Sequence, residues 1–329
     1  GKITEGSSTE THIASGVPGT VDGMIKVHSR YGKLRFREVI QPSIDLAKSG
    51  FPVTKVQANS LNRNRDHFIV RNAVRPAFVR DSLWKEGDIL RQPELAETLE
   101  RIRDNGREGF YSGKTAELIL KEMKRGNGII SRQDLDNYSS VFRKPLKSEY
   151  KGFTINTVPP PSGGGITLVQ LLKMVEPFPL KEWGFHSAKS IHFITEAEKR
   201  AFADRAKYSG DPDFVKISVD GLTDPEYLAG KMVNFDENKA SLSADISAGN
   251  PPGYESPQTT HYSVVDQDGN AVAATTTLND TFGNSIVVEG AGFLLNNEMD
   301  DFSVKPGEPN MYGLTGGEAN SVSPGKRML

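Results

Sequence analysis

Residues 258–279 read QTTHYSVVDQDGNAVAATTTLN, and this stretch decides how the whole chain is interpreted. Two runs rich in Thr, Val and Tyr, residues 260–265 and 271–278, flank the turn residues 268–270. Thr, Val and Tyr favour strands, whereas Asp, Gly and Asn favour the turn between them. The stretch therefore predicts a β-hairpin that carries an unusual number of hydroxyl groups.

The threonines of this hairpin have two interpretations. Threonine is a good strand former and Thr–Thr pairs stabilise sheets, so the first interpretation is structural. However, a Gly-, Pro- and Ser-rich stretch, residues 247–257, ends just before Gln258 and Thr259. Thr259 therefore lies at a predicted boundary between a flexible and an ordered segment, where the chain could be cut without breaking a strand.

The length of the hairpin loop decides which side chains share a face, because neighbouring residues of a strand point to opposite faces. A two-residue loop would pair Thr260 with Thr277 and leave Thr259 on the other face. A three-residue loop, 268–270, would pair Thr259 with Asn279 and place both on the face of Thr277. We predict the three-residue loop.

The stretch resembles the gamma-glutamyltransferase family, whose members are also called gamma-glutamyltranspeptidases or glutathione hydrolases. Similar motifs run along essentially the whole chain. They are Gly16-Val17-Pro18-Gly19-Thr20, Pro159-Pro160-Pro161-Ser162-Gly163-Gly164-Gly165, Thr259-Thr260-His261-Tyr262-Ser263, Gly269-Asn270, Thr275 to Asn279, Phe282-Gly283, Leu294 to Phe302 and Tyr312-Gly313-Leu314.

The resemblance implies an N-terminal-nucleophile hydrolase of class α+β, with an αββα sandwich that is incomplete here and a helix-rich N-terminal half. It implies self-cleavage between Gln258 and Thr259, which makes Thr259 both the nucleophile and, through its new α-amine, the base. Residues 1–258 would then be the large-subunit portion, ending in a flexible tail at 234–258. Residues 259–329 would begin the small subunit.

The resemblance also assigns the remaining site residues. Thr277 would hydrogen-bond the Thr259 hydroxyl; a packed strand threonine is the alternative. Asn279 and Glu298 match positions that hold the α-amino and α-carboxylate end of the substrate, and Asp301 matches the carboxylate that pairs with its ammonium group. On local sequence alone, the Asp300-Asp301 pair would instead be interpreted as a solvated turn. Tyr312 falls where many bacterial members carry an aromatic lid residue, and such a lid would exclude water and favour amine acceptors.

The implied reaction is γ-glutamyl transfer from glutathione or another γ-glutamyl donor to water or to an amino acid or peptide acceptor. It needs no cofactor. One alternative is an inactive, uncleaved fragment that acts only as a scaffold or binding module. Another is a related N-terminal-nucleophile acylase that acts on a different amide. Bacterial members of the family are commonly periplasmic or secreted, so the resemblance implies the same location.

The chain begins and ends inside the region of resemblance. It starts at Gly1 without a signal peptide or an initiating Met, and it stops at Leu329. An upstream arginine, a Ser-Ser segment and the Gly-Gly pair of the oxyanion hole would lie beyond these ends. Loss of an oxyanion donor typically costs about 10²–10³ in rate. We therefore expect this chain by itself to be inactive and to keep Gln258 joined to Thr259.

Composition excludes several other classes of function. The 329 residues include 40 basic and 42 acidic ones, for a net charge of −2, so nothing favours nucleic acid or an anionic membrane as a partner. There is no cysteine, which rules out disulfides, thiolate catalysis and zinc–thiolate sites. No apolar run approaches the length of a membrane span. The histidines have no ligand spacing, so we expect no metal site.

Hydrophobic periodicity and capping residues predict a mostly helical first part and strands further along. Thr20, Thr54, Ser131 and Ser187 are predicted helix starts. The expected helices cover 21–31, 37–48, 55–70, 93–105, 114–124, 166–176 and 187–208, with a short one from Ser131; the expected strands cover 146–150, 153–158, 285–288 and 293–295.

Overall fold

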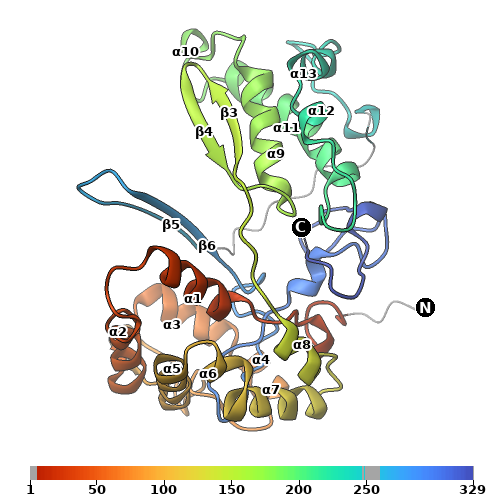
Figure 1. Ribbon diagram of the computed structural model, residues 1–329. Coiled ribbons are helices and arrows are strands. Elements are labelled where there is room, and N and C mark those ends of the chain that lie inside the picture. The colour runs from red at the N-terminus through yellow and green to blue at the C-terminus, as the bar shows by residue number, and fades with distance from the viewer. Residues whose placement is uncertain (1–5, 247, 249–259, 329) are drawn as a thin grey trace. The chain divides into compact units, whose positions relative to one another are not determined.

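The computed structural model describes residues 6–246, 248 and 260–328. Contacts divide the chain into two compact units. Unit 1 comprises residues 1–141 and 257–299, and unit 2 comprises residues 142–256 and 300–329. Figure 1 shows the helices and strands of which each unit is built.

Unit 1 consists mainly of helices whose ends follow from local sequence. The Thr54 hydroxyl accepts from the backbone N–H of Gln57 and starts α3, and Ser131 starts α8 in the same way. Its elements are η1 (His12–Ala14), α1 (Thr20–Tyr31), α2 (Phe36–Ser49), β1 (Phe51–Pro52), α3 (Lys55–Arg63), α4 (Arg65–Arg71), β2 (Ile89–Leu90), α5 (Pro93–Asn105), α6 (Glu108–Tyr111), α7 (Gly113–Arg125), α8 (Arg132–Asn137), β5 (Thr260–Val265) and β6 (Ala271–Thr276).

Two predicted helix boundaries in unit 1 are wrong. The helix expected over 55–70 breaks at Asn64, which separates α3 from α4. Thr20 is the first residue of α1 and not its cap; Gly19 precedes it, and a Cβ on Gly19 would lie only 2.0 Å from the Tyr138 hydroxyl. The close approach of Tyr138 therefore requires glycine at the N-cap position 19, and α1 begins without the side-chain cap that was expected from Thr20.

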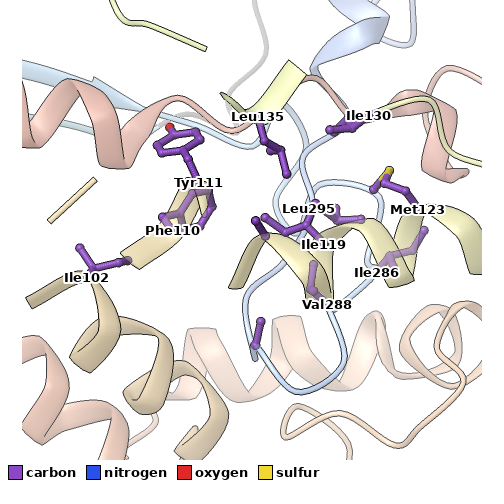
Figure 2. Close-up of a cluster of buried hydrophobic side chains, with 12 residues drawn as sticks. Ile102, Phe110, Tyr111, Ile119, Met123, Ile130, Leu135, Ile286, Val288 and Leu295 are labelled. Carbon is purple, nitrogen blue, oxygen red and sulfur yellow. The ribbon is translucent and has the colours of Figure 1, made fainter. Parts of the chain in front are cut away.

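The main core of unit 1 joins early helices to a late segment of the chain. Ile119 and Met123 of α7 pack with Ile286 and Leu295, as Figure 2 shows. Full burial of such side chains stabilises a fold by about 1.5–3 kcal/mol each. The strands predicted at 285–288 and 293–295 are reduced to a single bridge between Val287 and Leu294. The late segment thus completes a helical core instead of forming a sheet.

Unit 2 combines a hairpin with two long helices. Its glycine run, residues 163–165, was expected to be a loop but forms the first turn of α9, where Ser162 accepts from the Gly164 N–H at 3.3 Å. A Cβ on Gly165 would lie 1.8 Å from the Val158 carbonyl, so glycine permits this close approach. The elements are β3 (Leu146–Tyr150), β4 (Phe153–Thr157), α9 (Gly163–Val175), α10 (Leu180–Trp183), α11 (Ala188–Tyr208), α12 (Val219–Leu222), α13 (Pro225–Lys231), η2 (Ser243–Asp245) and η4 (Glu318–Asn320).

The strands that the structure describes form three two-stranded antiparallel sheets, which are β1–β2, β3–β4 and β5–β6. Helices and short antiparallel strands are consistent with the predicted α+β class and its incomplete sandwich, and likeness to solved structures confirms it below. The predicted division into residues 1–258 and 259–329 follows from a cleavage rather than from compactness, and it stays a prediction.

Candidate active site

The loop of the β5–β6 hairpin contains three residues, 267–269, and Asp266 closes it. The Asp266 carboxylate accepts from the backbone N–H groups of Asp268 at 3.0 Å and Asn270 at 2.8 Å. The pKa of Asp266 is lowered, mainly by the hydrogen bond from the Asn270 side chain. Gly269 has a φ of +80°, which glycine adopts without strain. The predicted odd loop length is therefore confirmed.

The register of the hairpin differs from the prediction by two residues. His261 pairs with Thr275, whereas the predicted loop at 268–270 would pair it with Thr277. The physical reason is the bond between the Asp266 N–H and the Asn270 carbonyl at 3.0 Å, which moves the loop back to 267–269. Since the shift is even, the odd-numbered residues still share one face.

Imidazole and hydroxyl groups meet on this odd-numbered face. Nδ1 of His261 lies 2.8 Å from the Thr275 hydroxyl, and Nε2 lies 3.4 Å from the Ser263 hydroxyl. Every residue of β5 is exposed. Gln258 and Thr259, the predicted cleavage pair, lie outside the described residues.

Thr277 follows the last residue of β6. Its hydroxyl oxygen accepts from the backbone N–H of Asn279 at 2.9 Å, which fixes a local turn. The predicted bond between Thr277 and Thr259 stays a prediction.

Asn279 is a buried residue in a left-handed backbone conformation. It is 5% exposed and has a φ of +74°, a conformation that asparagine tolerates better than most residues. Its side-chain Nδ2 donates to the carbonyl oxygen of Asn297 at 3.0 Å. The Asn297 side chain in turn accepts from the Asp280 N–H at 3.0 Å. Asn279 is therefore held by both its backbone and its carboxamide.

Asn296 and Asn297 support this arrangement, and the sequence analysis did not identify them. Asn296 exchanges two hydrogen bonds of 2.9 Å with the backbone of Gly16, and Asn297 donates to the Thr9 carbonyl at 3.2 Å. Both side chains are buried. The signal in the sequence was the Asn-Asn pair directly before Glu298, since two adjacent amides suit a segment that satisfies backbone groups on both sides.

Glu298 begins the short helix η3 (Glu298–Asp301). Its backbone N–H donates to Oδ1 of Asn296 at 3.1 Å, and its side chain is partly buried. The same asparagine that bonds Gly16 therefore fixes the start of η3. In unit 1, the structure thus brings Asn279 and Glu298 onto one network of buried asparagines.

Asp300 and Asp301 were interpretable from local sequence alone as a solvated turn, and the structure contradicts that interpretation. Asp300 is 3% exposed, and Asp301 is partly buried. Burial raises the pKa of Asp301 to about 7; the Asp300 charge adds to the rise, and Arg205 opposes it. The side-chain Nδ2 of Asn320 donates to the Asp301 carbonyl at 2.7 Å. Asp301 is thus a desolvated carboxyl in unit 2.

Tyr312 lies in a tight turn of unit 2. The Asn310 N–H donates to the Leu314 carbonyl at 2.9 Å, and Gly313 has a φ of +76°. Oδ1 of Asn310 accepts from the N–H groups of Tyr312 at 3.0 Å and Leu314 at 2.9 Å. The predicted lid residue is therefore held in a loop that is closed on itself.

A pocket of about 350 Å³ lies elsewhere in unit 1, between the segment after α4, the start of α5 and residues 287–292. None of the predicted site residues that the structure describes lines it. Three of its charged lining residues are already paired: Glu122 with His12 at 2.8 Å, Glu289 with Lys121 at 3.5 Å and Arg75 with Asp81 at 2.6 Å.

Residues 6–246, 248 and 260–328 contain neither a cluster of metal-ligating side chains nor a helix that could span a membrane. Within these ranges, no group of three or more His, Cys, Asp or Glu side chains could hold a metal ion. None of the helices described there combines the length and hydropathy that a membrane crossing requires.

Comparisons with known proteins cover the whole chain. A family profile described as Gamma-glutamyltranspeptidase matches residues 3–329. The chain is 46% identical to a glutathione hydrolase proenzyme of Escherichia coli over 328 residues, which are 98% of this chain and 56% of that protein. It is 35% identical to the acylase ACY 1 proenzyme of a Pseudomonas species over 319 residues, 96% of this chain and 54% of the relative. The chain thus spans about half the length of these relatives.

A solved structure supports the same assignment. The gamma-glutamyltranspeptidase of Helicobacter pylori matches with a TM-score of 0.72 at 36% identity, over 75% of this chain and 71% of that one. The predicted N-terminal-nucleophile hydrolase fold, in its incomplete form, is thereby confirmed.

Proposed function

Because this chain belongs to the gamma-glutamyltranspeptidase family, we propose that the protein containing it transfers the γ-glutamyl group of glutathione and other γ-glutamyl amides. Cleavage between Gln258 and Thr259 makes Thr259 the N-terminal nucleophile. Its hydroxyl oxygen bonds to the γ-carbonyl carbon, and the amide nitrogen leaves with a proton. Water or the amine of an amino acid or peptide then opens the γ-glutamyl ester and restores the hydroxyl. These steps use only protein groups and no cofactor.

The cleavage itself activates the nucleophile. A threonine hydroxyl is a weak nucleophile until a base takes its proton. A free α-amine has a pKa of about 7.7–8.0, close to the pH at which a general base works best. Before cleavage, Thr259 has no such amine. The uncut chain is therefore expected to be inert.

The observation that carries the substrate assignment is the desolvated carboxyl of Asp301. Burial raises the pKa of Asp301 to about 7 although the charge of Arg205 opposes the rise. An incoming ammonium group would add positive charge and favour the ionised carboxylate. Perturbed carboxyls of this kind mark candidate functional sites. A γ-glutamyl donor carries such an ammonium group on its α-carbon.

Asn279 and Glu298 are proposed to hold the same amino acid end of the donor. The side chain of Asn279 is positioned by its bond to the Asn297 carbonyl, and a carboxamide can accept from an ammonium group and donate to a carboxylate. The carboxylate of Glu298 can accept from the same ammonium. Thr277 is proposed to support the hydroxyl of Thr259.

Tyr312 is proposed to shield the γ-glutamyl ester from water, so that amines compete better as acceptors. Large and small subunits would arise from one precursor, in line with the proenzyme names of the relatives. A periplasmic or secreted location is proposed from membership of the family.

A second candidate function is hydrolysis of another amide, and the 35% identity to an acylase proenzyme favours it. The two functions differ in what the acyl group must carry. A γ-glutamyl donor has an α-ammonium group that Asp301 can bind, whereas a glutaryl amide has the same chain length without that group. A comparison of these two substrates therefore separates the candidates.

The test uses the full-length protein that contains this sequence. Its denatured mass after incubation is expected to show two pieces, the second starting at Thr259, while Thr259→Ala stays uncut. The γ-glutamyl amide is expected to be preferred over the glutaryl amide, and Asp301→Ala should reduce that preference about 30-fold or more. A single intact mass would contradict the nucleophile assignment. A preference that survives Asp301→Ala would make the substrate assignment wrong.

A further inference from the structure

The loop that carries Tyr312 is stabilised from within. Its arms are joined by the bond from the Gly307 N–H to the Gly316 carbonyl at 3.0 Å, and residues Pro309 and Thr315 form a bridge. The Asn310 side chain closes the tip, as described above. The Asn310 side chain therefore holds the tip together as one turn, so a bond to Met311 also helps to position Tyr312.

The tip is joined to η3 by a hydrogen bond to a buried charge. The backbone N–H of Met311 donates to Oδ2 of Asp300 at 2.9 Å. Asp300 is 3% exposed, whereas the Met311 side chain is 42% exposed. A carboxylate accepts more strongly than a neutral oxygen, and burial strengthens the bond further. Asp300 thus connects an exposed loop tip to the helix that carries Asp301.

The base of the loop does not depend on Asp300. The Gly317 N–H donates to the Ala206 carbonyl at 2.9 Å, and the Ser303 N–H donates to the Asn320 carbonyl at 3.0 Å. These bonds fix both ends of the loop against α11 and η4. Loss of the Asp300 carboxylate would therefore remove one attachment of the tip while the base stays in place.

We propose that Asp300 is a positioning residue that anchors the tip of the 307–316 loop, holds Tyr312 close to η3 and thereby favours transfer to amines over hydrolysis. The anchoring is a property of this chain, whereas its effect on the acceptor rests on the proposed function. Asp300 and Asp301 then have separate tasks within one turn. Asp301 binds the donor, and Asp300 sets the position of the loop that screens the ester from water.

A matched set of variants isolates the hydrogen bond. Asp300→Ala removes the acceptor, and Asp300→Asn removes the same charge but keeps an oxygen for the Met311 N–H. Met311→Ala changes the side chain and keeps the N–H. Limited proteolysis within residues 305–314 is expected to become about tenfold faster in Asp300→Ala and to change by less than about threefold in Asp300→Asn and Met311→Ala, since only Asp300→Ala removes the acceptor oxygen of the Met311 N–H. Equal rates in Asp300→Ala and the parent chain would overturn the anchor.

Hydrogen exchange of the unmodified chain gives an independent measurement should Asp300→Ala fail to fold. The amide of Met311 is expected to exchange at least about tenfold more slowly than that of Lys305, which precedes the loop, because a buried carboxylate holds the Met311 amide. Exchange of Met311 at the rate of an open loop amide would overturn the proposal.

The consequence for catalysis is measured in the full-length protein with a γ-glutamyl amide and an amine acceptor. The ratio of transfer to hydrolysis is expected to fall about tenfold in Asp300→Ala and to stay within about threefold of the parent in Asp300→Asn. An unchanged ratio in an active Asp300→Ala enzyme would overturn the inference and leave the γ-glutamyl assignment standing. Absence of γ-glutamyl activity in the parent would overturn the proposed function, while the proteolysis and exchange data would still decide the anchor.

Discussion

The β5–β6 hairpin and the segment that follows it, residues 278–301, are stabilised in opposite ways. The hairpin has a regular ladder of backbone pairs, yet its apolar side chains are exposed, with Val265 at 68% and Val272 at 57%. The following segment, which we call the asparagine–acid segment, has little regular structure, yet Asn279 is 5% and Asn297 1% exposed. In this part of the chain, the residues with regular secondary structure are therefore exposed, and the buried residues have little regular secondary structure.

The difference explains where the candidate binding residues lie. A residue outside helices and strands keeps a fixed position only if side chains satisfy its backbone groups. The asparagines of this segment do so: Asn297 bonds Asp280, and Asn284 donates to the Thr11 carbonyl at 3.0 Å. Asn279 and Glu298 are thus positioned by buried amides, whereas Thr277 lies at the exposed end of β6.

The largest expected effect concerns Asp301, at the end of the asparagine–acid segment. In the folded chain its pKa is about 7, and the ordinary value is 3.8. The folded state therefore holds a proton that the unfolded chain has released, so the contribution of this carboxyl to stability is present at low pH and is lost as the pH rises through 7. The full shift corresponds to as much as about 4 kcal/mol.

Asp301→Asn should remove this pH dependence. Urea unfolding of this chain is measured between pH 4 and pH 8. As the pH rises, the free energy of unfolding of the variant is expected to increase relative to that of the parent, so that the variant is the more stable of the two at pH 8. Asp268→Asn, in the exposed hairpin loop, is the matched control and should follow the parent. Parallel pH profiles for the parent and Asp301→Asn would show that the Asp301 carboxyl is hydrated and that the segment is not buried at its end.

A smaller effect is expected at Asn279, where hydrogen bonding and backbone conformation can be separated. Asn279→Ala loses the bond to the Asn297 carbonyl and places alanine at a φ of +74°. We expect a loss of about 3 kcal/mol in the free energy of unfolding, of which about 1 kcal/mol comes from the left-handed backbone. Asn279→Gly loses the same bond without the backbone cost, so it should lose about 2 kcal/mol.

Urea unfolding of the two Asn279 variants measures both terms. Equal losses in the alanine and glycine variants would mean that the positive φ relaxes in solution. A loss below 0.5 kcal/mol in both, which is roughly what surface changes produce, would mean that the asparagine network does not hold this residue.

Local sequence was sufficient for much of the fold. The caps at Thr54, Ser131 and Ser187 were predicted correctly, because a capping hydroxyl satisfies backbone groups only two or three residues away. The parity of the hairpin was predictable for a similar reason, since it depends on one loop length. The register was not predictable in this way, because the loop position depends on the bonds that the Asp266 carboxylate accepts from the loop, and strand and turn propensities do not encode these bonds.

The supports of the site could not be derived from the sequence in the same way. Asn296 bonds Gly16, and Asn297 bonds Thr9, across about 280 residues of chain, and no local pattern encodes such contacts. The burial of Asp300 was hidden because an Asp-Asp pair is typical of a solvated turn. The candidate site residues came from the family resemblance, whereas the structure shows the contacts that hold Asn279, Glu298 and Asp301 in place.

The smallest expected effect lies on the hairpin, at the cross-strand pair of Val264 and Val272. Both side chains are more than half exposed, so replacing both with threonine removes little buried apolar surface and keeps β-branched residues in the strands. The free energy of unfolding of this chain should change by less than about 0.5 kcal/mol. A loss above about 1 kcal/mol would mean that this face is covered in solution, which would end the contrast between the two regions. The same double substitution can be made in the full-length protein that contains this sequence. A larger loss of unfolding free energy there than in this chain would mean that other residues of the full-length protein bury this face of the hairpin.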